Sequence, residues 1–137
     1  AKVLRIKPTM FVIDAENNKT LRETEEILPD EDGFWTLEPG VYEVSCMETV
    51  KVGHNEMGLV INRSTYNRSG VVIRGSVFDD GYHGAIALSM YVNVAPIKIQ
   101  KGTRIAQYVT FAAESSCKYN GSYGFGTADE AKYGTGE

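Results

Sequence analysis

The sequence predicts an all-β domain built as a jelly roll, a sandwich or a small barrel, and three observations support this prediction. Short apolar runs recur along the chain and are separated by Gly, Asn, Asp and Pro, the pattern expected of strands joined by turns. A chain of 137 residues is most simply one domain, and its 42% hydrophobic content suffices for a buried core. Neither an internal repeat nor a coiled-coil heptad is evident.

The first half of the chain is expected to hold short strands and one candidate helix. The segment Lys19–Leu28 is the best helix candidate, because Leu21, Glu25 and Leu28 fall on one side, although a charged loop is an equal alternative. A Pro-Gly pair at 39–40 marks a turn before a strand. The strands expected here are Leu4–Ile6, Met10–Ile13, Trp35–Leu37, Val41–Cys46 and Thr49–Val52.

The second half continues the strand pattern and then changes composition. After Cys117 the chain is rich in Gly, Tyr and small polar residues, which predicts a β domain over 1–117 and a tail over 118–137. That tail is either disordered or a mobile flap that orders over a ligand, with Phe125 between two glycines as a stacking face. The strands expected here are Met57–Ile61, Val71–Ile73, Ile86–Val92, Ile97–Ile99 and Ile105–Ala112, with a turn at Gly102.

Charge and cysteine usage argue against several functional classes. The net charge of -4 disfavours nucleic-acid binding, because neutralising phosphates needs a basic face. No apolar run is long enough to span a bilayer, and the N-terminal residues lack a secretory apolar segment, so a cytoplasmic location is expected. Cys46 and Cys117 follow no metal-ligand spacing, which favours two buried thiols over a zinc site.

Three turns between residues 58 and 107 carry side chains suited to a polyanionic nucleotide. They are an Arg-Ser turn at Arg63 and Ser64, an Asp-Asp-Gly-Tyr loop that begins at Asp79, and a Gly-Thr-Arg-Ile-Ala-Gln turn that ends at Gln107. Arginine and hydroxyl groups bind phosphates, a carboxylate can activate a water, and an aromatic ring can lie against a sugar. The sequence therefore predicts a local nucleotide site on an acidic protein.

The order of these motifs resembles the trimeric dUTPase and dCTP deaminase superfamily. The matching segments are NRSTYNRSGV at 62–71, DDGYHG at 79–84, KGTRIAQ at 101–107 and SYGFGT at 122–127. The resemblance is good over about 35–111 and looser in the tail. It implies a jelly-roll-like β-barrel of the dUTPase type with a flexible Gly-rich C-terminal tail. It also implies a homotrimer with sites between subunits, a deoxynucleoside triphosphate substrate, and magnesium (Mg²⁺) held through the substrate phosphates.

The resemblance also assigns roles to the first two matching turns. Arg63 and Ser64 would contact the phosphate chain, with Arg68 at a further polar position. Asp79 would orient and deprotonate the attacking water, and Tyr82 would pack under the deoxyribose. Backbone groups around 75–78 would read part of the base edge. The neighbouring Asp80 is expected to be a solvated turn residue, and it is the alternative base if the register is shifted by one.

The later motifs supply the remaining contacts. Gln107 would bind the phosphates, and Arg104 would act as a structural or phosphate-side arginine. Phe125 would stack on the base bound at a neighbouring subunit, and Thr127 would donate to the terminal phosphates. Asn120 stands about where the family often has an arginine for the γ-phosphate.

Two departures from the family pattern bear on the reaction. The first motif is eroded, because Phe11 and Val12 stand in place of a Tyr-Asp pair and Asp14 comes two residues late. Ser89 stands where the deaminases place a catalytic glutamate, and a serine cannot shuttle the proton that deamination requires. Hydrolysis of dUTP to dUMP and pyrophosphate is therefore preferred to dCTP deamination. The alternatives are a nucleotide-binding regulatory protein with weakened chemistry and a pyrophosphatase for another deoxynucleotide.

Overall fold

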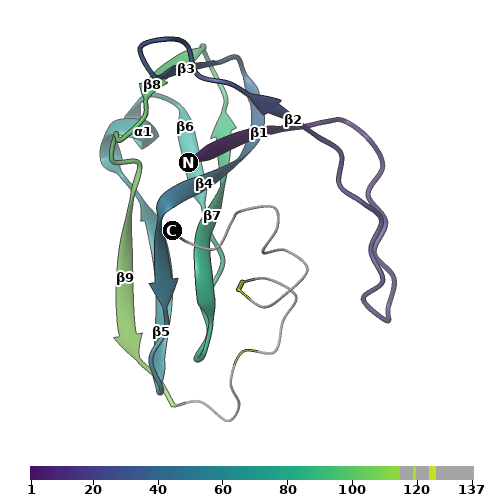
Figure 1. Ribbon diagram of the computed structural model, residues 1–137, viewed down its shortest axis with the longest axis vertical. Helices are drawn as coiled ribbons and strands as arrows, with labels where there is room; N and C mark the ends of the chain where they lie inside the picture. The colour runs from purple at the N-terminus through teal and green to yellow at the C-terminus, as the bar shows by residue number, and fades with distance from the viewer. Residues whose placement is uncertain (115–118, 120–123, 126–137) are drawn as a thin grey trace.

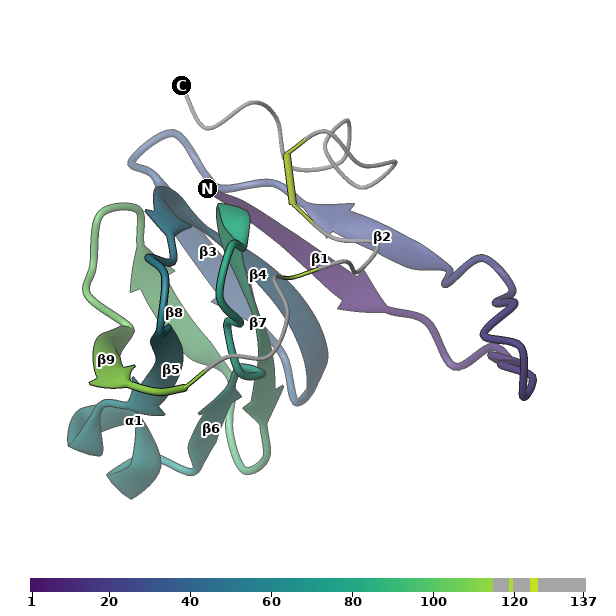
Figure 2. The ribbon, with the colours of Figure 1, turned by 90° about the horizontal axis from the view of Figure 1, so that it is seen from below.

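The chain folds into antiparallel strands arranged in two facing layers (Figures 1 and 2). The computed structural model describes residues 1–114, 119 and 124–125. One layer is a five-stranded sheet, and the other consists of two small sheets and the short helix α1 (Ser64–Arg68). The large sheet has the order β2 (Thr24–Ile27), β1 (Lys2–Ile6), β4 (Gly40–Lys51), β7 (His83–Val92), β6 (Val71–Arg74). The small sheets pair β3 (Phe34–Leu37) with β8 (Ile97–Gln100) and β5 (Glu56–Asn62) with β9 (Ala106–Ala112).

The core lies between these layers and follows from the alternation of side chains along the strands. In β7, Ile86, Leu88 and Met90 are buried and belong to one apolar cluster with Trp35 and Ile99 from β3 and β8. Successive residues of a strand face opposite sides, so the alternate positions of β7 face the outside of the sheet. The all-β, jelly-roll-like fold predicted from the sequence is thus confirmed. No helix among the described residues has the length and apolar character needed to span a membrane.

The predicted strand Met10–Ile13 and the predicted helix Lys19–Leu28 are both wrong. The chain instead forms a projecting arm between β1 and β2, in which the Thr20 N–H donates to the Val12 carbonyl at 2.9 Å. The end of the predicted helix is β2, which pairs along the free edge of β1. Pairing with β1 gives the backbone groups of β2 their hydrogen-bond partners, whereas Leu21 and Leu28 of the predicted helix are exposed, so no packed apolar face stabilises a helix here.

The two strands predicted on either side of Met47 are one long bent strand. β4 pairs with β7 along its whole length, and the register shifts between Ser45 and Thr49. Such a bulge bends a strand without ending it. The Arg-Ser turn also differs from expectation, because Ser64–Arg68 closes into the short helix α1 with Tyr66 buried beneath it.

An apolar pocket of about 540 Å³ lies between the layers, and Tyr108 of β9 is one of the residues that line it. Tyr108 packs edge-on against Phe78, and its hydroxyl is enclosed without a hydrogen-bond partner among the described residues. Burial raises the pKa of this hydroxyl above its ordinary value. A Cβ on Gly58 would clash with the hydroxyl and ring of Tyr108, so a larger residue there requires the Tyr108 side chain to move.

Replacing Tyr108 with phenylalanine should stabilise the protein. The substitution removes a buried polar group that has no partner, so the free energy of unfolding should rise by about 1 kcal/mol in urea denaturation. Gly58→Ala should be destabilising, and Tyr108→Phe should partly rescue it because the oxygen nearest the new methyl is gone. A loss of stability in Tyr108→Phe alone would contradict the account of this hydroxyl.

Candidate functional site

The Asp-Asp-Gly-Tyr loop is held in place by the turn that joins β4 to β5. Phe78 exchanges two backbone hydrogen bonds with Gly58, at 2.8 and 2.9 Å. On the other side of the loop, the Val52 N–H donates to the Tyr82 carbonyl at 2.8 Å. Two long-range backbone contacts therefore fix the ends of the loop, one against the start of β5 and the other against the turn before it, which limits the conformational freedom of the loop.

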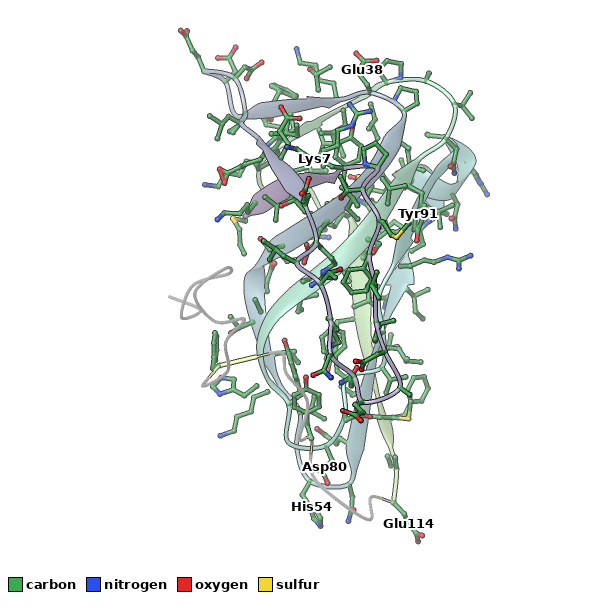
Figure 3. The ribbon with its side chains drawn as sticks, turned by 90° about the vertical axis from the view of Figure 1, so that its right-hand side faces the viewer. Lys7, Glu38, His54, Asp80, Tyr91 and Glu114 are labelled. Atoms are coloured by element: carbon green, nitrogen blue, oxygen red, sulfur yellow. The ribbon has the colours of Figure 1, made fainter. Side chains whose placement is uncertain are left out.

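Asp80 forms a third attachment, and the expectation that it is a solvated turn residue is wrong. Its side chain is only 4% exposed. One carboxylate oxygen is 3.0 Å from Nδ1 of His54 and accepts from the Asn55 backbone N–H at 3.3 Å. Figure 3 shows Asp80 and His54 together at one end of the molecule. A buried carboxylate needs such partners, because burying a charge without them is costly. Nothing in the local sequence identifies His54 as the partner, because it lies 26 residues earlier.

Asp79 is an exposed position of this loop between two buried ones. Its neighbours Phe78 and Asp80 are both buried, whereas Asp79 is exposed. The buried Asp80 thus orients the loop so that the adjacent carboxylate points outward. An exposed carboxylate on a rigid loop can accept a proton from a bound water, which is the chemistry predicted for Asp79.

An open pocket of about 450 Å³ lies beside the loop on the outer face of the five-stranded sheet. Its walls are the segment from Gly75 to Phe78, the ring of Tyr82 and Tyr119. Tyr82 is buried, donates through its hydroxyl to the Ala85 carbonyl at 2.8 Å, and meets Tyr119 edge-on with ring centroids 5.2 Å apart. The structure therefore brings together the aromatic ring and the backbone segment for which sugar and base contacts were predicted.

The floor of the same pocket is polar, which the sequence did not suggest. Glu43 of β4, Ser89 of β7 and Arg74 of β6 all line it. Ser89 is the position where the deaminases have glutamate, so the structure places this position inside the pocket. The sequence does not indicate that Glu43 lines this pocket, because its position there depends on which strand lies next to β7.

The predicted phosphate-binding residues form a second group at the other end of β5. Arg63 follows β5 directly, and its guanidinium donates to the Arg104 carbonyl at 2.6 Å. Gln107 pairs with Ile61 across the β5–β9 ladder and is exposed. Ser64 and Arg68 are the first and last residues of α1, and both are exposed. The structure thus brings the second and fourth motifs side by side.

Asn62 holds this second group together, a role that the sequence analysis missed. Its side-chain oxygen accepts from the Ile73 N–H at 2.9 Å, and its side-chain nitrogen donates to the Val71 carbonyl at 3.3 Å. The amide also bonds the side chain of Asn67 in α1. The Asn62 side chain therefore connects β5, α1 and β6 through hydrogen bonds. These bonds pair backbone groups of β6 with a side chain of β5.

Within one chain, the Asp79 loop lies apart from the predicted phosphate-binding residues. The loop with Asp79 bonds to Gly58 near the start of β5, whereas Arg63 follows Asn62 at its end. Four residues of strand span about 13 Å. Figures 1 and 3 agree, because α1 and the labelled Asp80 lie toward opposite ends of the molecule.

The described part of the tail contacts the Asp79 loop. The Phe125 N–H donates to the His83 carbonyl at 2.9 Å, and the two rings meet edge-on with centroids 4.8 Å apart. Gly124, at φ +102°, lies so close to Gly84 that a Cβ on Gly84 would be 2.7 Å from its Cα. The fifth motif therefore lies against the third within one chain. Thr127 and Asn120 lie outside the described residues.

The eroded first motif forms a turn. Asp14 accepts hydrogen bonds from the backbone N–H groups of Glu16 and Asn18, and from the Asn18 side chain. The bond from the Asn18 side chain contributes most to lowering the pKa of Asp14 below its ordinary value. Asn17 takes the left-handed conformation at φ 66°. The carboxylate of Asp14 therefore stabilises the turn at the tip of the arm.

The described residues contain neither a low-pKa thiol at Cys46 nor a cluster of protein metal ligands. Burial, which is the main cause, raises the pKa of the half-buried Cys46 thiol to about 11, so the reactive thiolate is scarce at neutral pH. Cys117 lies outside the described residues. Among residues 1–114, 119 and 124–125, no three His, Cys, Asp or Glu side chains gather to form a possible metal site.

Known proteins of one family are similar to this chain over most of its length. Residues 2–113 match the family described as dCTP deaminase-like. A relative from Methanopyrus kandleri, called a probable deoxyuridine 5'-triphosphate nucleotidohydrolase, is 31% identical over 125 residues, which is 90% of this chain and 80% of the relative. A dCTP deaminase, dUMP-forming, from Bifidobacterium longum is 30% identical over 129 residues, 90% of this chain and 66% of the relative. The solved structure of the EIAV dUTPase shares 24% identity with a TM-score of 0.44, covering 66% of this chain and 84% of that one.

The two adjacent aspartates should differ sharply in their effect on stability. Asp80→Ala should lower the free energy of unfolding by about 1–3 kcal/mol, because it leaves the Asn55 N–H without its acceptor and opens a buried site. Asp79→Ala should change it by no more than about 0.5 kcal/mol, because that side chain is exposed. Chemical denaturation of both variants measures the difference. Equal losses would show that the loop does not bury one carboxylate and expose the other.

Proposed function

This chain belongs to the dCTP deaminase-like family, and from that premise we propose that it hydrolyses dUTP to dUMP and pyrophosphate. The observation that carries the proposal is the exposed carboxylate of Asp79 on a loop fixed at both ends, next to a pocket with an aromatic wall. Geometry of this kind suits a base that must hold one water in a defined position.

In the proposed reaction, water attacks the α-phosphorus in line with the leaving pyrophosphate. Asp79 accepts a proton from the water as the new P–O bond forms. The bond between the α-phosphorus and the bridging oxygen breaks, and its electron pair leaves with pyrophosphate. Negative charge on the phosphate oxygens must be stabilised throughout, so positioning and electrostatics account for most of the catalysis.

The phosphate contacts are proposed to come from a second copy of the chain in a homotrimer. Arg63, Ser64, Arg68 and Gln107 suit phosphate binding, since arginine can donate two parallel hydrogen bonds to one phosphate. The separation of Arg63 from Asp79 along β5 supports this arrangement, because a substrate bound at the pocket would meet the arginine group of a neighbour. The arm between β1 and β2 also exposes large apolar side chains, which are commonly covered by association: Met10, Phe11, Val12, Ile13 and Leu21.

The nucleoside would lie in the pocket beside the loop. The ring of Tyr82 would pack against the deoxyribose, and the backbone of 75–78 would meet the base. Phe125 would cover the base of a nucleotide shared with a neighbouring subunit, and its ring contact with His83 places it beside the third motif in space. Thr127 would donate to the terminal phosphates.

Magnesium would be bound mainly through the substrate. Hard oxygen donors are the ligands it prefers, and the substrate triphosphate offers donors of that kind. When bound, the ion would neutralise charge on the phosphates.

The second candidate is a nucleotide-binding protein with little turnover. It is favoured by Asp14, whose hydrogen bonds to Glu16 and Asn18 engage it in a turn and leave the first motif without its usual acid. The two candidates differ in one measurement, because a binder would hold a deoxynucleotide without releasing pyrophosphate.

Replacing Asp79 with asparagine should lower turnover of dUTP about 10²- to 10⁴-fold and leave nucleotide binding intact, since the amide keeps the shape but cannot take the proton. Pyrophosphate release measures turnover, and calorimetry with a non-hydrolysable dUTP analogue measures binding. Asp32→Asn, in the turn before β3, is the control and should behave as wild type. Near-normal turnover in Asp79→Asn would remove this residue from the mechanism.

Arg63→Ala should weaken phosphate binding at sites shared between copies. Mixing an Arg63→Ala chain with an Asp79→Asn chain should restore part of the activity, because a mixed trimer contains some sites with both residues intact. Sedimentation of the wild-type chain should give three times the monomer mass. A stable monomer, or mixed variants with no recovered activity, would contradict the shared site.

A further inference from the structure

Part of the pocket floor is a row of three polar side chains on adjacent strands, beside Ala85 and Ala87 of β7. Glu43 of β4 is the direct partner of Ser89 in β7, and Ser89 is the direct partner of Arg74 in β6. Direct partners in an antiparallel pair project from the same face of the sheet. All three residues line the pocket, so their side chains cross its floor in the order Glu43, Ser89, Arg74.

The order of these three side chains sets where the floor offers hydrogen-bond acceptors and where it offers donors. An ionised glutamate only accepts, a serine hydroxyl both donates and accepts, and an arginine only donates. Neighbouring strands are about 4.8 Å apart, so the row spans about 10 Å, which is enough to face one edge of a pyrimidine ring. The segment Gly75–Phe78 follows Arg74 directly, so the row adjoins the backbone groups expected to contact the base.

The two pyrimidines differ at the group that would meet Glu43. Cytosine carries an amino group at position 4, which donates, whereas uracil carries an oxygen there, which accepts. Beside the amino group, cytosine presents acceptors at its ring nitrogen 3 and at oxygen 2. These suit the hydroxyl of Ser89 and the guanidinium of Arg74. Uracil would instead place an oxygen against a carboxylate, and neither group can donate.

We propose that Glu43 determines base specificity and makes dCTP a substrate for pyrophosphate release, in competition with dUTP. The proposal rests on the nucleotide pyrophosphohydrolase activity proposed above. The reaction is dCTP and water giving dCMP and pyrophosphate, with no loss of the amino group. Ser89 supplies a hydroxyl where a deaminase has glutamate, and the carboxylate on the next strand recognises the amino group that remains.

The test replaces Glu43 with glutamine. The amide keeps the size of the side chain but supplies a donor that can face the uracil oxygen, so preference should move from dCTP toward dUTP. The ratio of kcat/KM for dCTP to that for dUTP should fall about 10- to 100-fold, the effect of losing one hydrogen bond to a charged group. Calorimetry with α,β-imido analogues of both nucleotides should show the same shift in the ratio of Kd values.

Glu26→Gln is the matched control. Glu26 lies two strands away on the same face, pairing with Leu4, which itself pairs with Glu43. It lies 3.6 Å from Lys2 and does not line the pocket, so the variant removes one negative charge from the sheet without touching the floor. Its dCTP-to-dUTP ratio should match that of the wild type.

The outcomes separate this proposal from the proposed function. If wild type releases pyrophosphate from neither nucleotide, the pyrophosphohydrolase activity fails, while the analogue Kd ratios still test Glu43. An unchanged ratio in Glu43→Gln overturns the specificity role whether or not the enzyme is active. Ammonia released from dCTP by wild type and lost in Glu43→Gln would also overturn it, because Glu43 would then transfer protons.

Discussion

The docking of the Asp79 loop onto the β4–β5 turn is the constraint on which the candidate site depends. Through their backbones, Phe78 is tied to Gly58 at the start of β5 and Tyr82 is tied to Val52 in the turn, while Asp80 is tied to the turn through a buried carboxylate. The same attachments produce two results. They leave Asp79 facing solvent, and they set the ring of Tyr82 into the wall of the pocket. A loop without them would have to be ordered by the substrate, at a cost in conformational entropy.

Strand β5 is the second constraint, because it separates the loop that carries the Asp79 carboxylate from the turn that carries the predicted phosphate-binding residues. Its start bonds to the loop that carries the carboxylate, and its end leads into the arginine turn, which Asn62 and the Arg104 carbonyl hold in place. A strand is stiff and extended, so the halves cannot meet by a small adjustment within one chain. In the homotrimer proposed above, association of identical chains would unite the two halves and would also cover the apolar arm.

The outer face of the large sheet carries the polar groups that bear on the choice between hydrolysis and deamination in the proposals above. Ser89 removes the proton-transfer group that a deaminase has at this position, yet the pocket keeps a carboxylate at Glu43, one strand away. Cross-strand pairing can therefore supply a charged group to a pocket from a part of the chain distant in sequence. The hydrogen-bonding character of the floor depends on the three strands together.

Local pattern was sufficient to predict much of this protein. Alternation in Ile86–Val92 identified a half-buried strand, and the turns at 62–71, 79–84 and 101–107 identified the segments that carry the polar groups. These features depend on neighbours in sequence, whose periodicity and turn chemistry a single chain displays directly. What the sequence alone could not determine was which distant segments meet. The residues 24–27 became a strand because β1 offered a free edge, Asp80 became buried because His54 and Asn55 lie against it, and Glu43 entered the pocket because β4 neighbours β7. Each outcome depends on contacts between residues far apart in the chain, so only the tertiary structure could decide it.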